Sequence, residues 1–482
     1  MRARAIARVV GVLTAFTGLA MLLPLVVSLL HSENRSAKAL LLSCGITMGA
    51  GGGMYLSSGR ERYILSHREG MAVVALGWAL AGLFGGLPFY IGEVFPSFTD
   101  AAFESISGFT TTGSSVLTDI ESVDRGMLLW RSFIQWLGGM GIIVLSLAVL
   151  PFLGVGGMQL YKAEVPSPVP DKLTPRIRET AALLWKVYIL FTALQVLLLS
   201  AGGMDLFESV CHSFTTMPTG GFSTRNASVG EFESAYFEWV IVAFMALAGV
   251  NFTLHYRALT GNPRSFTKDP ECRVYLALLA GLTLLVALDT HGPVYQSFGK
   301  ALRYAAFQVT SILTTTGYAT ADYEKWPAFS QLILMLCMFV GASAGSTGGA
   351  MKVLRVVLVA KYCYRELFRL IHPRVVMPVK LGKKAVPEEV LHGVMGFFAL
   401  YMGVFAVSGV ILCLMGVDLV TSLAAVAATM GNIGPGIGDV GPMENFAHIP
   451  AAGKWLLMWC MLLGRLEIYT IIILLVPEFW RK

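Results

Sequence analysis

Apolar runs about 20 residues long recur along the whole chain, and each is long enough to cross the hydrocarbon core of a bilayer as a helix. This feature restricts the fold more than any other. Of the 482 residues, 55% are hydrophobic and only 14% are charged, and the mean hydropathy of +0.67 is outside the range of ordinary soluble domains. The sequence therefore predicts an all-α polytopic membrane protein with no soluble domain.

We expect ten spans, at residues 8–31, 38–57, 70–95, 127–153, 180–201, 233–260, 273–290, 328–362, 388–416 and 452–477. The first run follows Arg2, Arg4 and Arg8 and could be mistaken for a secretory signal. It is too long for a signal core, and no cleavage site of small residues follows it. We therefore interpret it as the first transmembrane helix.

Lysine and arginine concentrate in alternate loops, most densely between Lys352 and Lys384. The loops between them carry acidic residues such as Asp119, Glu231 and Glu324. Since short cytoplasmic loops are enriched in basic residues, this pattern places both termini in the cytoplasm. The membrane also explains the net charge of +6 better than nucleic acid does, so no nucleic-acid binding is predicted.

The four connections on the predicted outer side are too long and too apolar to be plain loops. Three of them repeat one pattern, in which a short apolar segment begins at Phe103, Phe207 or Phe307 and ends in threonine and glycine. These ends read TTTGSS, TTMPTGGFS and TTTGYAT, and the fourth connection, NIGPG, keeps the position and a glycine. Each connection is predicted to enter the membrane as a short helix and to return as a loop.

Such a unit suits an ion pore, because an ion that enters a pore loses its water and backbone carbonyls must replace it. Glycine permits the backbone angles that point successive carbonyls at one axis, and irregular backbone at membrane depth is tolerated where it lines a cavity. The negative end of each short helix also favours a cation. An alternative is that threonine and glycine only let helices pack closely, but three copies in equivalent positions disfavour it.

The segments FESISGFTTTGSS, TTMPTGGFST, QVTSILTTTGYAT and NIGPG resemble the filter loops of the Trk/Ktr/HKT potassium transporter superfamily, most closely its bacterial TrkH-type membrane subunits. The resemblance covers nearly the whole chain. It implies four helix, re-entrant pore loop, helix repeats around a pseudo-four-fold pore, preceded by two N-terminal transmembrane helices. The implied boundaries are 1–69 for the N-terminal helices and 70–160, 161–265, 266–385 and 386–482 for the four repeats.

The resemblance further implies a potassium filter lined by the carbonyls of the two residues before a key glycine in each loop. With their glycines, the implied residues are Thr111, Thr112 and Gly113; Thr219, Gly220 and Gly221; Thr315, Thr316 and Gly317; and Asn432, Ile433 and Gly434. Gly431 offers a competing register in the fourth loop. Plant relatives that conduct sodium have serine at the first glycine, so Gly113 favours potassium.

The family also has an intramembrane gate loop below the filter, which matches GASAGSTGG at residues 341–349. We predict that Gly341, Gly345, Gly348 and Gly349 form a flexible constriction there, because glycine weakens a helix. The alternative is a continuous helix that packs through glycines at four-residue spacing.

Arg465 is expected near the middle of the last span, where it either faces the pore as a gate residue or forms a buried ion pair.

These features predict channel-like potassium uptake across the bacterial inner membrane, with potassium both transported and bound in the filter. One alternative is a sodium- or proton-coupled symporter, although intramembrane carboxylates are scarce; another is a scaffold with a vestigial pore.

The resemblance implies a homodimer and a cytoplasmic TrkA-type nucleotide-binding regulatory subunit, which the basic loops could bind. His212 is interpreted as a structural hydrogen-bonding residue. No HExxH, Walker A or GxSxG motif is present, so we predict that the chain is not an enzyme.

Overall fold

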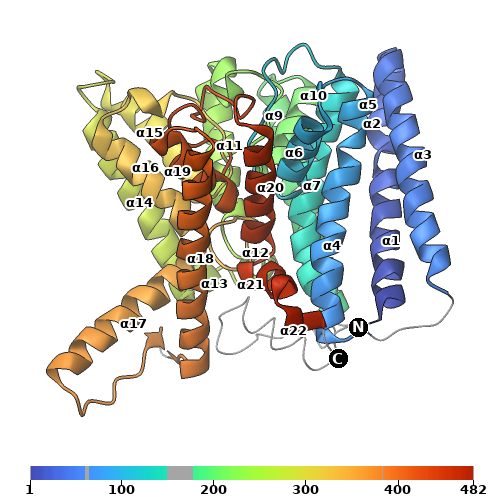
Figure 1. Cartoon of the computed structure of the whole chain (residues 1–482). Coiled ribbons are helices and arrows are strands. Elements are labelled where there is room, and N and C mark those ends of the chain that lie inside the picture. The colour runs from blue at the N-terminus through green and yellow to red at the C-terminus, as the bar shows by residue number, and fades with distance from the viewer. Residues whose placement is uncertain (1, 60–64, 149–176, 383, 481–482) are drawn as a thin grey trace.

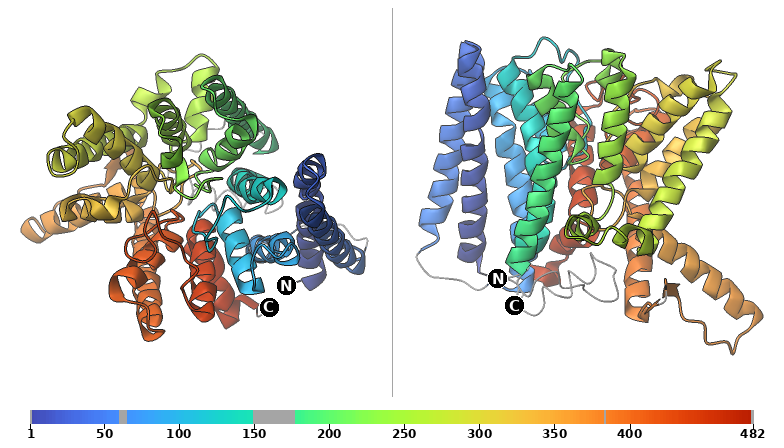
Figure 2. Two further views of the ribbon diagram at one scale, coloured as in Figure 1. Left: turned by 90° about the horizontal axis from the view of Figure 1, so that it is seen from above. Right: turned by 180° about the vertical axis from the view of Figure 1, so that it is seen from behind.

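The computed structural model describes residues 2–59, 65–148, 177–382 and 384–480. Long helices stand side by side through one layer (Figure 1), and from above they surround a common centre (Figure 2). The predicted fold class is confirmed: the chain is an all-α polytopic membrane protein with four helix, re-entrant loop, helix repeats around a pseudo-four-fold pore, and with additional N-terminal helices.

The N-terminal helices lie outside the ring of repeats (Figure 2). They are α1 (Ala3–Ala20), α2 (Leu22–Leu30) and α3 (Asn34–Ser57). Glycines let α1 and α3 cross closely, since a Cβ placed on Gly51 would lie 2.5 Å from Ala15 N and one on Gly11 would lie 2.7 Å from Gly51 O. Small residues at such crossings are typical of helix pairs in membranes.

Each repeat contains a first long helix, a shorter helix and a second long helix. The first repeat holds α4 (His67–Gly85), α5 (Leu87–Ile91), α6 (Phe98–Phe109) and α7 (Arg125–Ala148), and the second holds α9 (Ile177–Ala201), α10 (Leu206–Thr216), α11 (Ala235–Ala248) and α12 (Phe252–Leu259). The third holds α14 (Pro270–Thr290), α15 (Phe298–Leu313), α16 (Ala328–Val340) and α17 (Val353–Ile371), and the fourth holds α18 (Glu388–Leu414), α19 (Leu419–Met430), α20 (Ala451–Arg465) and α21 (Ile468–Ile472). The remaining elements are short: η3 (Ser228–Phe232), α13 (Ser265–Lys268), η4 (Tyr323–Lys325), β1 (Lys380–Leu381), β2 (Lys384–Ala385), η5 (Ile473–Leu475) and α22 (Pro477–Trp480).

The shorter helices α6, α10, α15 and α19, here called the half-helices, have 12, 11, 16 and 12 residues. They are too short to cross a bilayer, which takes about 20 residues. Side chains cap three of their N-termini: Ser97 accepts from Asp100 N, Asp205 from Phe207 N, and Asp418 from Thr421 N. Such caps satisfy amides that have no partner within the helix. The cap residues therefore fix where α6, α10 and α19 begin.

Two predicted spans are broken rather than continuous. Residues 233–260 form α11 and α12, bent by 101°, and residues 452–477 form α20 and the helical segment Ile468–Leu475, bent by 120°. At the first break, Asn251 Oδ1 accepts a hydrogen bond from Thr253 N at 2.8 Å and so starts a new helix. At the second, Glu467 has a φ of +60°. The apolar pattern runs through both breaks, so hydropathy alone predicted single helices.

Six helices among the described residues are long and apolar enough to cross a membrane, and the two bent pairs raise this number to eight. The other two of the ten expected spans correspond to α7 and to the interrupted pair of α16 and α17. Parts of the basic loops, and the predicted boundary between residues 160 and 161, lie outside the described residues.

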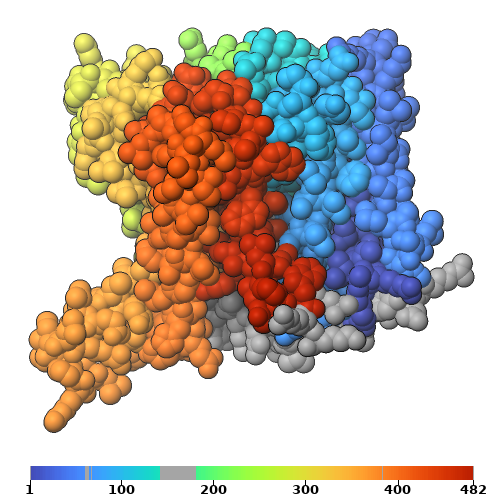
Figure 3. Space-filling view, viewed as in Figure 1, coloured from blue at the N-terminus to red at the C-terminus, as the bar shows by residue number. Residues whose placement is uncertain are grey.

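Both ends of the chain lie at the same end of the long helices (Figure 1). Helix α17 projects from that end, away from the other helices, as the space-filling view also shows (Figure 3). The half-helices lie toward the opposite end (Figure 1).

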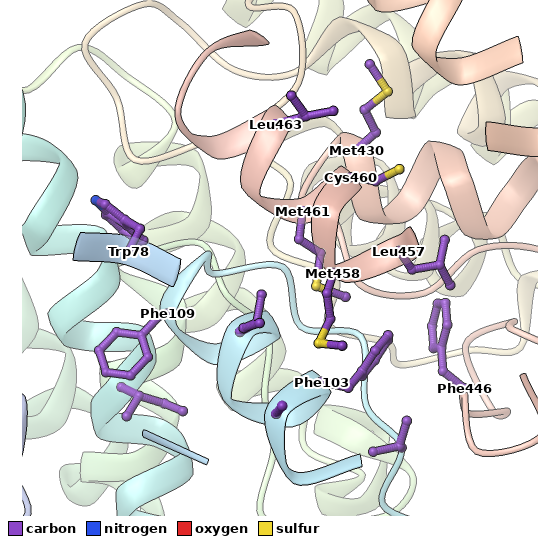
Figure 4. Packing of buried hydrophobic residues seen from close by; sticks show 14 of the residues in the cluster. Trp78, Phe103, Phe109, Met430, Phe446, Leu457, Met458, Cys460, Met461 and Leu463 are labelled. Atoms are coloured by element: carbon purple, nitrogen blue, oxygen red, sulfur yellow. The ribbon is translucent and has the colours of Figure 1, made fainter. Parts of the chain in front are cut away.

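An apolar core holds half-helix α6 against α20 of the fourth repeat (Figure 4). Phe103 packs on Phe446, with ring centroids 5.7 Å apart, beside Met458 and Met461. All of these side chains are buried. The first and last repeats therefore close the ring through continuous hydrophobic packing, which places the loop after α6 at the centre.

Candidate ion pore

The four loops that follow the half-helices share one backbone conformation. We name them loop 1 (residues 111–113), loop 2 (residues 219–221), loop 3 (residues 315–317) and loop 4 (residues 432–434). In each, the first residue and the final glycine have left-handed φ angles: Thr111 +51° and Gly113 +83°, Thr219 +59° and Gly221 +75°, Thr315 +61° and Gly317 +83°, Asn432 +53° and Gly434 +108°. Gly431, the alternative register, has a right-handed φ of −78°.

The amide groups of the loops point back to the half-helices. The middle residue of every loop donates its N–H to a carbonyl five residues earlier, and all four bonds measure 2.8 Å: Thr112 to Ser107, Gly220 to Thr215, Thr316 to Ser311, and Ile433 to Ala428. These bonds also satisfy carbonyls at the helix ends that would otherwise lack partners. The same local geometry is therefore built four times.

The loops surround one centre in chain order, because each final glycine lies against the middle carbonyl of another loop. A Cβ placed on Gly113 would lie 2.2 Å from Gly220 O, one on Gly221 1.9 Å from Thr316 O, one on Gly317 1.8 Å from Ile433 O, and one on Gly434 3.1 Å from Thr112 O. Three of these distances are too short for any side chain. Glycine is thus required by contact as well as by its left-handed backbone.

The carbonyls of the first and middle loop residues are buried, yet most lack a hydrogen-bond donor. Of these eight carbonyls, only that of Gly220 accepts a hydrogen bond from a described residue, which is Gln135. Buried backbone carbonyls are normally paired. Since the C-terminal ends of four half-helices also direct their negative dipoles here, the site is suited to a cation.

A cavity of about 90 Å³ lies next to the loops and is lined by residues that follow them in the chain, such as Ser114, Phe222 and Pro435. The final glycines of all four loops line it, together with Arg131, Arg225 and Glu444. The cavity therefore gives one shared approach to all four loops.

A buried ion pair that we did not predict connects loops 1 and 2. Arg131 on α7 donates from Nε to Glu104 Oε1 at 2.6 Å and from Nη1 to Ser223 O at 2.8 Å. Glu104 also accepts from Ser115 Oγ and Val116 N, each at 2.9 Å. The signal in the sequence was a glutamate between apolar residues of a membrane half-helix, where a charge is disfavoured unless it is paired.

Breaking this pair is expected to destabilise the protein strongly. Glu104→Gln leaves the Arg131 charge buried, which costs about 3–5 kcal/mol, so the thermal unfolding temperature in detergent should fall clearly. The matched control is Glu93→Gln, which removes the partner of Arg35 in an exposed pair and should change stability by no more than about 1 kcal/mol. Equal stability of the two variants would contradict this role of Glu104.

The second repeat positions His212 within half-helix α10. Its ring bonds Glu208 O through Nδ1 at 2.9 Å and Ser223 Oγ through Nε2 at 3.1 Å. The side chain is fully buried. It thus connects the half-helix to the segment after loop 2, which is the structural role expected from the sequence.

The predicted gate residues lie in an irregular segment between α16 and α17, which we call the gate segment (residues 341–349). It is not helical, so the alternative of a continuous helix packed through glycines is wrong. Thr347 Oγ1 donates to Met217 O at 2.9 Å, and Gly349 N donates to Thr315 Oγ1 at 2.7 Å. Ala350, directly after the segment, donates its N–H to Gly431 O at 3.0 Å. The segment therefore contacts the ends of half-helices α10, α15 and α19.

Arg465 is the last residue of α20, at the break, and not in the middle of a continuous span. Its Nη1 donates to Thr347 O in the gate segment at 2.6 Å, and the residue is 7% exposed. Among the described residues no carboxylate pairs with it, and the nearby Glu467 instead pairs with Arg355 at 2.7 Å. Arg465 and the amino group of Lys352, which bonds Gly348 O, both hold the gate segment by its carbonyls.

Comparison with known proteins gives one consistent family. The family model described as "TrkH: Cation transport protein" matches residues 43–482. The Trk system potassium uptake protein TrkH of Halomonas elongata is 43% identical over the full length of both chains, and that of Escherichia coli K12 is 41% identical, also over both full lengths. The crystal structure of the potassium transporter TrkH from Vibrio parahaemolyticus superposes with a TM-score of 0.91 at 39% identity and covers both chains entirely.

Proposed function

The chain belongs to the TrkH family of cation transport proteins, and we propose that it takes up potassium ions through a selective, channel-like pore. The observation on which this proposal rests is a set of eight buried carbonyls at the ends of four half-helices, seven of which have no donor among the described residues. The members of this family are transporters, so the prediction that the chain is not an enzyme is confirmed.

In this proposal the potassium ion gives up its water in the four loops. The carbonyls that replace the water belong to Thr111, Thr112, Thr219, Gly220, Thr315, Thr316, Asn432 and Ile433, and Gly113, Gly221, Gly317 and Gly434 set their direction. Selectivity over sodium depends on the number and the field of these dipoles. Since three glycines touch a carbonyl of another loop, a change in one loop should alter the ligands of the next.

The gate is the segment of residues 341–349 together with Arg465. Its hydrogen bonds to Met217 O and Thr315 Oγ1 place it beside the filter loops. The guanidinium of Arg465 holds this segment through Thr347 O, and a positive charge near the path raises the energy of a passing cation. Opening would require this segment to move away from the half-helix ends.

We assign the regulation to a cytoplasmic TrkA-type nucleotide-binding subunit and the assembly to a homodimer. Helix α17 follows the gate segment directly and projects from the end of the molecule that holds both termini (Figure 1). The basic residues between Lys352 and Lys384 lie in this region, which supports a cytoplasmic position for that end in the inner membrane. A subunit that binds and shifts α17 would therefore also move the gate segment.

Ion flux in liposomes tests this function against coupled symport. The purified full-length chain is expected to carry potassium down the potassium gradient alone, with a reversal potential independent of imposed sodium and proton gradients. A reversal potential that shifts with either gradient would instead show a sodium- or proton-coupled symporter. Absence of any potassium flux would contradict transport by this chain.

A further inference from the structure

Loop 2 lacks the side-chain bond that stabilises loops 1 and 3. In loop 1 the hydroxyls of Thr110 and Thr112 are 2.7 Å apart, and in loop 3 those of Thr314 and Thr316 are 2.8 Å apart. The equivalent residues of loop 2 are Pro218 and Gly220, neither of which carries a hydroxyl. A group from elsewhere must therefore hold this loop if it is to match loops 1 and 3.

Gln135 on α7 occupies that position. Its Nε2 donates to Gly220 O at 2.7 Å, and its Oε1 accepts from Phe222 N at 3.2 Å. The side chain is completely buried. One amide thus bridges the peptide groups on both sides of Gly221, which has a left-handed φ of +75°. The first of these peptides is held on its other side by the hydrogen bond from Gly221 N to Thr215 O at 3.1 Å.

The glycine at position 220 is explained by the same contact. Gly220 is not among the residues with positive φ, so its backbone would accept a side chain. A Cβ there would lie 2.4 Å from Cδ and Oε1 of Gln135, which is too close for any atom. The missing side chain of loop 2 therefore leaves the space that the Gln135 amide fills.

We propose that Gln135 is a positioning residue that determines ion selectivity by fixing the direction of the Gly220 carbonyl. This inference depends on the proposed function, because it concerns the same filter. A carbonyl oxygen has two lone pairs, so one can accept from Gln135 while the other faces the ion. Without the bridge the peptide after Gly220 keeps the bond from Gly221 N to Thr215 O but loses the bond to its carbonyl, so the direction of the Gly220 carbonyl is less restrained.

The test compares Gln135→Leu with the wild-type full-length chain in liposomes. The potassium-to-sodium permeability ratio is expected to fall between about two- and tenfold, the effect of one net hydrogen bond of about 0.5–1.5 kcal/mol. The matched control is Gln195→Leu on α9, since Gln195 is equally buried and its amide has no hydrogen-bond partner among the described residues. That variant should keep the wild-type ratio.

A double-variant cycle distinguishes positioning from general damage. Gly220→Ala alone should lower the permeability ratio, because its methyl group collides with the Gln135 amide. In a Gln135→Ala background the same change should have little further effect, since the space is then free. Additive effects of the two substitutions on the ratio would overturn the proposed contact.

The outcome for Gln135 can be separated from the outcome for the filter itself. A wild-type chain that does not distinguish potassium from sodium would contradict the proposed function. A selective wild-type chain whose Gln135→Leu variant keeps the full ratio would overturn the role of Gln135 alone. If the leucine variant does not fold, Gln135→Met, with an unbranched chain of similar length, gives the deciding ratio.

Discussion

Replacing Gly113 with serine is expected to lower the potassium-to-sodium permeability ratio by about tenfold or more, which corresponds to about 1.4 kcal/mol. Gly113 has a φ of +83°, a conformation that costs other residues roughly 1–2 kcal/mol. A Cβ on it would lie 2.2 Å from Gly220 O, so the carbonyl of loop 2 must also move. The substitution therefore disturbs ligands in two loops at once and should admit sodium.

The matched control for this experiment is Gly203→Ser. Gly203 has a similar φ of +98°, but no atom lies within 4 Å of a Cβ placed there. It carries the same backbone penalty without contact to the filter, so its permeability ratio should equal that of the wild type. An unchanged ratio in folded Gly113→Ser protein would remove Gly113 from the filter.

Replacing Arg465 with alanine is expected to raise potassium flux by about tenfold or more, if the gate limits the rate, while the permeability ratio stays unchanged. The substitution removes the hydrogen bond to Thr347 O and a positive charge beside the path. Both changes favour an open gate segment, and neither removes a carbonyl of the four filter loops. The measurement is potassium flux per folded protein in liposomes, together with the potassium-to-sodium ratio.

Arg465→Lys separates the two causes. Lysine keeps the charge, so flux should stay near the wild-type level if the charge sets the barrier, and should rise if the bond to Thr347 O sets it. Thermal stability gives a further check: since no carboxylate of the described residues pairs with Arg465, its loss should not cost the roughly 3–5 kcal/mol of a broken buried ion pair. Wild-type flux in a folded alanine variant would exclude Arg465 from the gate.

The sequence predicted features that depend on local pattern. The apolar runs identified the helices, and the recurring threonine and glycine motif located loops 1 to 3, because each glycine must adopt a left-handed φ within its own short segment. Loop 4 was harder, since Gly431 and Gly434 both fit the motif; only the backbone angles separate them.

Features that depend on contacts between distant residues could not be predicted in this way. The bends after Ala248 and Arg465 are hidden by apolar residues that continue through them. The pairs of Glu104 with Arg131 and of Gln135 with Gly220 connect residues far apart in sequence. Hydropathy and spacing carry no information about such pairings, although a charged or amide residue in an apolar helix signals that a partner exists.

The central claim is that the carbonyls of the four loops bind potassium, and anomalous diffraction from crystals soaked in thallium(I), a potassium congener, tests it most directly. We predict anomalous density at the centre of the ring formed by Thr112, Gly220, Thr316 and Ile433, lost in excess potassium but retained in the same concentration of sodium. Density elsewhere in the protein with none between the loops, or displacement by sodium as readily as by potassium, would contradict the claim.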